Sequence, residues 1–77
     1  MNDADLRKGM VVRYVGDVHR YMRGYRVKLL HPILDDNDRP TGRWDAAPWI
    51  EAENRFSWVT SDVRPDELEP LDGEGQA

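Results

Sequence analysis

Two short runs of β-branched and aromatic residues, each set off by glycine, constrain the fold of this chain most strongly. The first run, residues 10–15, lies between Gly9 and Gly16, and the second, residues 25–30, follows Gly24. In the second run apolar and basic residues alternate with a period of two, which is the pattern of a strand with one buried and one polar face. The two runs therefore predict neighbouring strands of a β-fold.

The middle of the chain is less regular. The second strand is expected to end at Pro32, because a proline cannot donate to a central ladder, with residues 33–34 continuing as an edge. Residues 35–42 are rich in Asp, Asn, Pro and Gly and predict a turn. The following residues fit either a short helix capped by Asp45 or a strand over 49–52, and we favour a strand or an irregular stretch.

The last third of the chain returns to a β pattern. Residues 56–60 are aromatic and β-branched and predict a strand that ends at residues 61–62. The proline that begins residues 65–67 suits the start of a single 3₁₀ turn. Residues 68–71 then predict the strand that completes the sheet.

The length of 77 residues leaves room for one core only. The chain has no cysteine, so neither a disulfide nor a thiolate zinc site supports that core. Residues 1–7 and 72–77 are polar and are expected to be flexible, which leaves one domain over 8–71. In so small a protein at least one tryptophan belongs to the core, and Trp58, within a predicted strand, is our choice.

Charge is distributed unevenly along the chain. Residues 1–34 carry seven Arg or Lys and three Asp, whereas residues 35–77 carry four Arg and twelve acids, so the two parts hold +4 and −8. Strands of a small barrel interleave, and a mixed solvated surface is therefore a simpler expectation than separate basic and acidic faces. The net charge of −4 also differs from the basic balance that is usual in a nucleic-acid-binding domain.

The residue pattern contains no catalytic or metal-binding motif. His19 and His31 each stand alone, without the spacing of a zinc site, and residues 35–42 place Arg39 or Pro40 where a calcium loop needs its third ligand. We expect no enzymatic activity, no metal and no cofactor. The acidic N-terminus does not suit a signal peptide, and no apolar run has the length of a membrane span, so we expect a cytoplasmic protein without membrane contact.

Over residues 8–71 the order of these features is similar to that of the SH3-like small β-barrels. The features are Gly9 with a strand, a Gly-Asp loop, Gly24 with a second strand, Trp58-Val59, a short turn and the closing segment 66–71. The resemblance implies an all-β barrel of about five strands with a 3₁₀ turn before the last. SH3 domains, KOW-type modules and Tudor-like domains share this fold, so the resemblance implies a binding module without choosing its partner.

A protein partner is the first expectation for such a module. Trp44 and Trp49 lie beside Gly42 and Pro48 and are predicted to be exposed, where they would act as aromatic anchors with Tyr21. The predicted partner-binding residues are Tyr21, Arg23, Trp44 and Trp49. A non-enzymatic adaptor, accessory or inhibitor protein of a bacterium or bacteriophage fits this description, with the origin inferred from composition.

The alternative is a KOW-like domain that binds RNA or DNA. Residues 19–26 interleave cationic and aromatic side chains, so that guanidinium groups would hold phosphates while a tyrosine ring stacks on a base. The predicted anion contacts are Arg20, Arg23, Arg26 and Lys28. In a third reading, the acidic part of the chain mimics nucleic-acid charge and occupies a basic groove of another protein. The sequence determines neither the partner's identity nor the oligomeric state.

Overall fold

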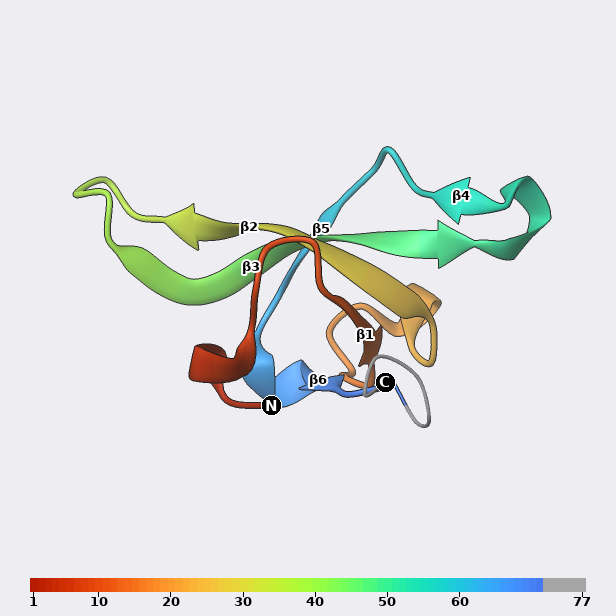
Figure 1. Cartoon of the computed structure of the whole chain (residues 1–77), viewed down its shortest axis with the longest axis horizontal. Helices are drawn as coiled ribbons and strands as arrows, with labels where there is room; N and C mark the ends of the chain where they lie inside the picture. The colour runs from red at the N-terminus through yellow and green to blue at the C-terminus, as the bar shows by residue number, and fades with distance from the viewer. Residues whose placement is uncertain (72–77) are drawn as a thin grey trace.

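The computed structural model describes residues 1–71 and shows an all-β fold in which six antiparallel strands form one open sheet (Figure 1). The strand order is β4-β3-β2-β1-β6, and β5 pairs with β3. The strands are β1 (Val11–Tyr14), β2 (Arg26–Leu34), β3 (Pro40–Ile50), β4 (Arg55–Phe56), β5 (Ser61–Val63) and β6 (Leu68–Glu69). Four 3₁₀ turns accompany them: η1 (Asp3–Asp5), η2 (Arg20–Met22), η3 (Glu51–Glu53) and η4 (Pro65–Glu67). Across residues 1–71 no helix is long and apolar enough to cross a membrane.

A long hairpin of β2 and β3 forms the centre of the fold and extends across its full width (Figure 1). The alternation predicted for β2 is confirmed, because Val27 and Leu29 are fully buried while Arg26 and Lys28 lie on the other face. Tyr25 departs from the pattern and is 50% exposed. It precedes β2, and its N–H donates to the carbonyl oxygen of Met22 at 3.0 Å, which closes the turn that follows η2, so it does not follow the alternation of the strand.

The uncertain middle segment is a continuous strand. Asp45, considered as a helix cap, lies inside β3, opposite His31 of β2 on one edge and Asp62 of β5 on the other. Pairing on both edges engages the backbone hydrogen-bonding groups here, which a short isolated helix could not match. The expectation of a strand is therefore correct for residues 49–50, but the strand begins already at Pro40, and residues 51–52 are wrong because they lie in η3.

The turn between β2 and β3 is shorter than predicted. The carboxylate of Asp35 accepts hydrogen bonds from the backbone N–H groups of Asn37, at 2.8 Å, and Arg39, at 3.0 Å. These bonds close the turn before Pro40, which pairs with Leu34. The expected end of the second strand at Pro32 is wrong, because β2 runs on to Leu34, and the continuation over residues 33–34 is confirmed. Register shifts lie between Leu29 and His31 and between Pro32 and Leu34, on either side of the proline that has no N–H to donate.

The burial of Trp44 and Trp58 is the reverse of the prediction. Trp58, predicted to be buried, is 85% exposed, while Trp44, predicted to be exposed, is 8% exposed and belongs to the core. The predicted strand 56–60 is wrong, because β4 ends at Phe56 and pairing resumes only at β5. Trp58 thus lies in a connection that leaves the sheet. Trp44 pairs with Val63, which is fully buried, and shares its inward face.

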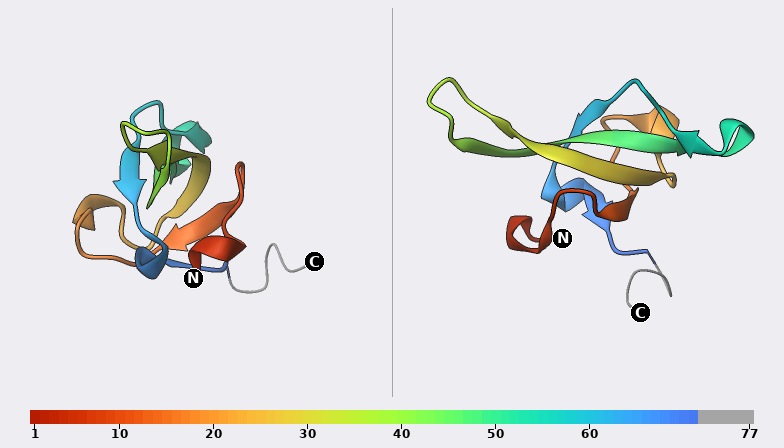
Figure 2. Two further views of the ribbon diagram at one scale, coloured as in Figure 1. Left: turned by 90° about the vertical axis from the view of Figure 1, so that its left-hand side faces the viewer. Right: turned by 45° about the horizontal axis from the view of Figure 1, so that its top comes forward.

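The core extends toward the N-terminus beyond the predicted boundary at residue 8, because Leu6 packs in the same cluster as Val12 and Leu68. The predicted turn η4 is confirmed, and the last strand is β6 rather than the full segment 68–71. The end-on view shows strands that curve around the core without forming a closed barrel (Figure 2). The predicted C-terminal tail, residues 72–77, lies outside the described residues.

Candidate binding surfaces

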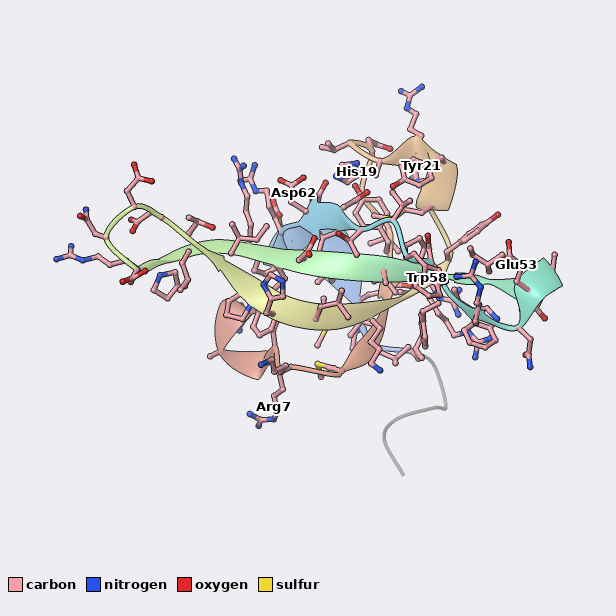
Figure 3. All side chains as sticks on the ribbon, turned by 90° about the horizontal axis from the view of Figure 1, so that it is seen from above. Arg7, His19, Tyr21, Glu53, Trp58 and Asp62 are labelled. Carbon is pink, nitrogen blue, oxygen red and sulfur yellow. The ribbon has the colours of Figure 1, made fainter. Side chains whose placement is uncertain are left out.

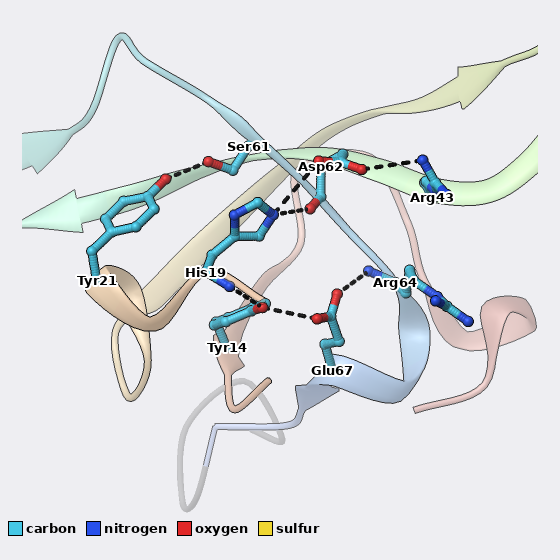
Figure 4. A network of polar contacts seen from close by, with 8 residues as sticks. All are labelled: Tyr14, His19, Tyr21, Arg43, Ser61, Asp62, Arg64 and Glu67. Carbon is cyan, nitrogen blue, oxygen red and sulfur yellow. Dashed lines mark hydrogen bonds and ion pairs between the residues drawn. The ribbon is translucent and has the colours of Figure 1, made fainter. Parts of the chain in front are cut away.

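A cluster of polar side chains ties the segment between β1 and β2 to the C-terminal third of the chain (Figure 4). Its centre is the fully buried Tyr14, whose hydroxyl donates to Oε2 of Glu67 at 2.9 Å and accepts the backbone N–H of His19 at 3.0 Å. The other carboxylate oxygen of Glu67 accepts the N–H of Arg64 at 3.0 Å. We call Tyr14, His19, Ser61, Asp62 and Glu67 the clasp.

The outer part of the clasp holds η2 against β5. Nε2 of His19 donates to the carbonyl oxygen of Asp62 at 2.7 Å, and the hydroxyl groups of Tyr21 and Ser61 are hydrogen bonded. The carboxylate of Asp62 also lies 3.5 Å from a guanidinium nitrogen of Arg43. No side-chain polar atom that is buried within residues 1–71 lacks a hydrogen-bond partner. The clasp is therefore a satisfied structural network that fixes the loop.

The space around Glu67 is closely filled. A methyl group added at Gly16 would lie 2.6 Å from Oε2 and 2.8 Å from the Cβ and Cγ atoms of Glu67. These separations are shorter than van der Waals contact, so only glycine allows the chain leaving β1 to approach the carboxylate this closely. The N–H of Val15 donates to the carbonyl oxygen of Glu67 at 2.8 Å and completes the junction.

We expect the stability of the protein to fall in alkaline solution through Tyr14. Burial raises the pKa of the Tyr14 hydroxyl above its ordinary value of 10.0, and the hydrogen bond to Glu67 and the charge of Glu67 raise it further. The hydrogen bond from the His19 N–H lowers this pKa and so opposes the shift. The folded state therefore holds this proton more tightly than the unfolded chain. The resulting stability is complete below the unfolded pKa and is lost as pH rises through the folded pKa.

Urea unfolding at a series of pH values from about 8 to 11 measures this effect, with Tyr14→Phe as the matched variant. The wild-type midpoint should decline more steeply above about pH 10 than that of Tyr14→Phe. Parallel declines for the two proteins would contradict the role given to Tyr14.

Exposed apolar side chains flank the clasp on two segments. Val18 and Tyr21 come from the connection between β1 and β2, and Trp58 and Val59 come from the connection between β4 and β5. We call these four residues the loop surface. Tyr21 and Trp58 lie on the same side of the molecule as Glu53, and the turn at 35–39 lies at the opposite end (Figure 3). The clasp joins the first segment to β5, into which the second segment leads.

The connection that carries Trp58 is ordered by local contacts. The N–H of Val59 donates to the hydroxyl oxygen of Ser57 at 3.0 Å, which forms a tight turn around Trp58. The guanidinium group of Arg55 lies 5.5 Å from the centre of the indole ring, within cation–π range. Trp58 is thus held outward in a defined position while its ring stays open to solvent.

A second surface lies on the outer face of the sheet, where one row of side chains crosses four strands. Arg13 of β1 is opposite Arg26 of β2, whose guanidinium group lies 5.2 Å from the ring of Trp49 of β3. Trp49 is in turn opposite Phe56 of β4, with ring centres 4.9 Å apart in an edge-to-face arrangement. Residues directly opposite one another share a face of the sheet, so the row is continuous.

The row borders a groove of about 760 Å³ whose lining includes Tyr25 and Glu51. We call Arg13, Tyr25, Arg26, Lys28, Trp49 and Phe56 the cation–aromatic face. The ammonium group of Lys28 lies 5.8 Å from the ring centre of Phe56. The indole N–H of Trp49 donates to Glu51 at 2.7 Å, and Arg26 is 3.9 Å from the same carboxylate. The groove therefore combines cations, aromatic rings and one exposed carboxylate.

The structure separates the residues that the sequence grouped as one site. Tyr21 lies on the loop surface, Arg23 is exposed and 2.6 Å from Asp17, and Trp49 lines the groove. Burial removes Trp44 from the set of residues that a partner could contact directly. Of the predicted anion contacts, Arg26 and Lys28 lie on the cation–aromatic face, while Arg20 and Arg23 belong to the η2 segment.

Sequence reasoning missed Arg13 and Trp58. The alternation in β1, where Val12 and Tyr14 are buried, does place Arg13 on the outward face, so that signal was available. For Trp58 the adjacent Ser57 offered a turn signal, but the aromatic and β-branched run favoured a strand. Within residues 1–71, no three His, Asp or Glu side chains form a group that could hold a metal ion.

The fold and these surfaces define a small all-β domain with two outward-facing clusters of aromatic side chains. Compared with protein-family models, with curated proteins and with solved structures, this chain matches none of them. Its function must therefore be inferred from its own residues.

Proposed function

We propose that this chain is a non-enzymatic module that binds a partner protein through the loop surface. The observation that carries the proposal is Trp58, a large apolar side chain that is 85% exposed and held on an ordered turn. Val59 beside it and Tyr21 on the opposite segment are also exposed. Trp, Tyr and Arg are the residues most enriched among the strongest contacts of protein interfaces.

The local order of the two segments supports this function. A contact residue that is already held in position loses less conformational entropy when it binds. Trp58 is positioned by the turn at Ser57 and by Arg55, and Tyr21 by its bond to Ser61. We expect the partner to offer an apolar pocket that receives the indole ring.

The arrangement of strands also supports a binding module of the SH3-like kind. β1 pairs with both β2 and β6, and η4 immediately precedes β6, where the resemblance implies a 3₁₀ turn before the last strand. In this assignment the SH3-like domain covers the predicted residues 8–71, and Leu6 adds to its core. Its loops then present the contact residues on a fixed scaffold, which is how such small domains bind partners.

The experiment compares partner capture by the wild-type protein, Trp58→Ala and the matched control Leu34→Ala, using a lysate of the source cells. Leu34 is also an exposed apolar residue, but it lies at the end of β2, near the turn at 35–39. A captured protein is then purified, and its affinity for each variant is measured by calorimetry. We expect Trp58→Ala to weaken binding by at least about thirtyfold and Leu34→Ala by less than about twofold.

Circular dichroism and thermal melting establish that both variants are folded. A direct complex that Trp58→Ala leaves intact would contradict the loop surface as the binding site. Failure to recover any direct partner under conditions that preserve weak complexes would count against the function itself.

A further inference from the structure

We infer that the cation–aromatic face is a second binding site, which holds two or three nucleotides of single-stranded nucleic acid. The site is distinct from the loop surface, since none of Val18, Tyr21, Trp58 or Val59 lines the groove. It shares Tyr25, Arg26 and Lys28 with the nucleic-acid contacts predicted from the sequence, but it adds Arg13 and Trp49 and leaves out Arg20 and Arg23.

The aromatic side chains supply surfaces on which bases can stack. Trp49 is fixed by Phe56 on one side and by its hydrogen bond to Glu51. Tyr25, on the wall of the same groove, is 50% exposed. Stacking on aromatic rings is the main sequence-independent contribution to single-strand binding, because every base has a π face.

The cations lie where the phosphates of a stacked strand would pass. Arg13, Arg26 and Lys28 extend from two adjacent strands on the same face of the sheet. Glu51 is the one carboxylate among the residues that line the groove, and its side chain is 89% exposed, so it can turn toward solvent when a phosphate approaches Arg26. Glu69 lies opposite Arg13 on β6 and limits the positive charge at that end.

The size of the face matches a short single strand. Neighbouring strands are about 4.8 Å apart, so a row across four strands is about 14 Å long. A four-stranded sheet with exposed aromatic residues stacks two or three bases in this way. A duplex keeps its bases inside the helix and could offer only phosphates. An acidic peptide would likewise engage the cations but leave the rings without planar partners, so the combination favours single-stranded nucleic acid.

The test is fluorescence anisotropy of a labelled oligothymidylate and a labelled oligouridylate, each of about eight nucleotides, in about 20 mM salt. The variants Tyr25→Ala and Arg26→Gln change the groove. The matched controls Arg20→Gln and Arg23→Gln remove equal charge from the exposed η2 segment. A duplex of the same length and a hexaglutamate peptide serve as competitors.

We expect Tyr25→Ala and Arg26→Gln each to weaken oligonucleotide binding by about tenfold, and the two control variants by less than about twofold. The slope of log affinity against log salt should be about −1.5 to −2, which corresponds to two or three phosphates. Trp58→Ala should bind the oligonucleotide as the wild type does, so this site and the loop surface can fail independently.

Three results would overturn the inference. The first is no binding of either oligonucleotide in low salt. The second is an equal loss of affinity in the groove variants and the η2 variants, which would indicate general charge attraction. The third is displacement by the duplex or the hexaglutamate peptide at concentrations equal to that of the single strand, which would show that the rings do not contribute.

Discussion

Replacing Trp44 by alanine is expected to destabilise the fold by about 3–5 kcal/mol, the usual cost of removing a buried large aromatic side chain. Trp44 lies in the middle of β3, opposite Pro32 of β2 and Val63 of β5, and contributes to the core. The whole stability of a domain of this size is only about 3–5 kcal/mol. Trp44→Ala should therefore be largely unfolded at room temperature.

The matched control is Trp58→Ala, which removes the same side chain from an exposed position. It should change the free energy of unfolding by less than about 1 kcal/mol. This is the expected cost of a surface substitution together with the loss of the cation–π contact with Arg55. Urea unfolding followed by far-ultraviolet circular dichroism measures both. A larger loss of unfolding free energy in Trp58→Ala than in Trp44→Ala would contradict the structure. It would instead support the prediction from the sequence that Trp58 belongs to the core.

Replacing Glu67 by alanine should destabilise the protein by about 2–3 kcal/mol, because one buried and one partly buried donor lose a charged acceptor. These donors are the Tyr14 hydroxyl and the Arg64 N–H, at 2.9 and 3.0 Å from the carboxylate oxygens. Glu67 is buried, with 9% of its surface exposed, so water does not readily replace the lost hydrogen bonds. The neighbouring Asp66→Ala, at an exposed position of the same turn, should cost less than about 0.5 kcal/mol.

A double-mutant cycle separates the bond between Tyr14 and Glu67 from the other contacts of each residue. The cycle combines Glu67→Ala with Tyr14→Phe and measures the free energy of unfolding of all four proteins. We expect a coupling energy of about 1–2 kcal/mol. Additive effects of the two substitutions would show that the clasp does not depend on this bond, and that Glu67 acts through the turn η4 alone.

The two proposed surfaces make different demands on the fold. The loop surface depends on the clasp, because Tyr21 and the connection after β4 are held through Ser61 and Asp62. The cation–aromatic face depends instead on strand register, since Arg13, Arg26 and Trp49 come together only when β1, β2 and β3 pair as observed. Substitutions in the clasp should therefore affect partner binding before they affect oligonucleotide binding.

Local patterns were sufficient for the parts of the fold whose partners are near in sequence. Strands β1 and β2 and the turn η4 were predicted because their signals are glycine brackets, alternation and a proline at a turn. The same alternation predicted the buried faces of Val27 and Leu29. Each of these features reflects backbone geometry and side-chain type within a few residues.

The sequence by itself thus determined the class of fold, the first two strands and the absence of a cysteine framework. Tertiary structure alone decided which tryptophan is buried, because that depends on whether β5 pairs with β3 at Trp44, a contact between residues far apart in the chain. It also decided the composition of the two surfaces. Burial of any large apolar side chain stabilises the fold, and the long-range strand register determines which of these side chains faces the core.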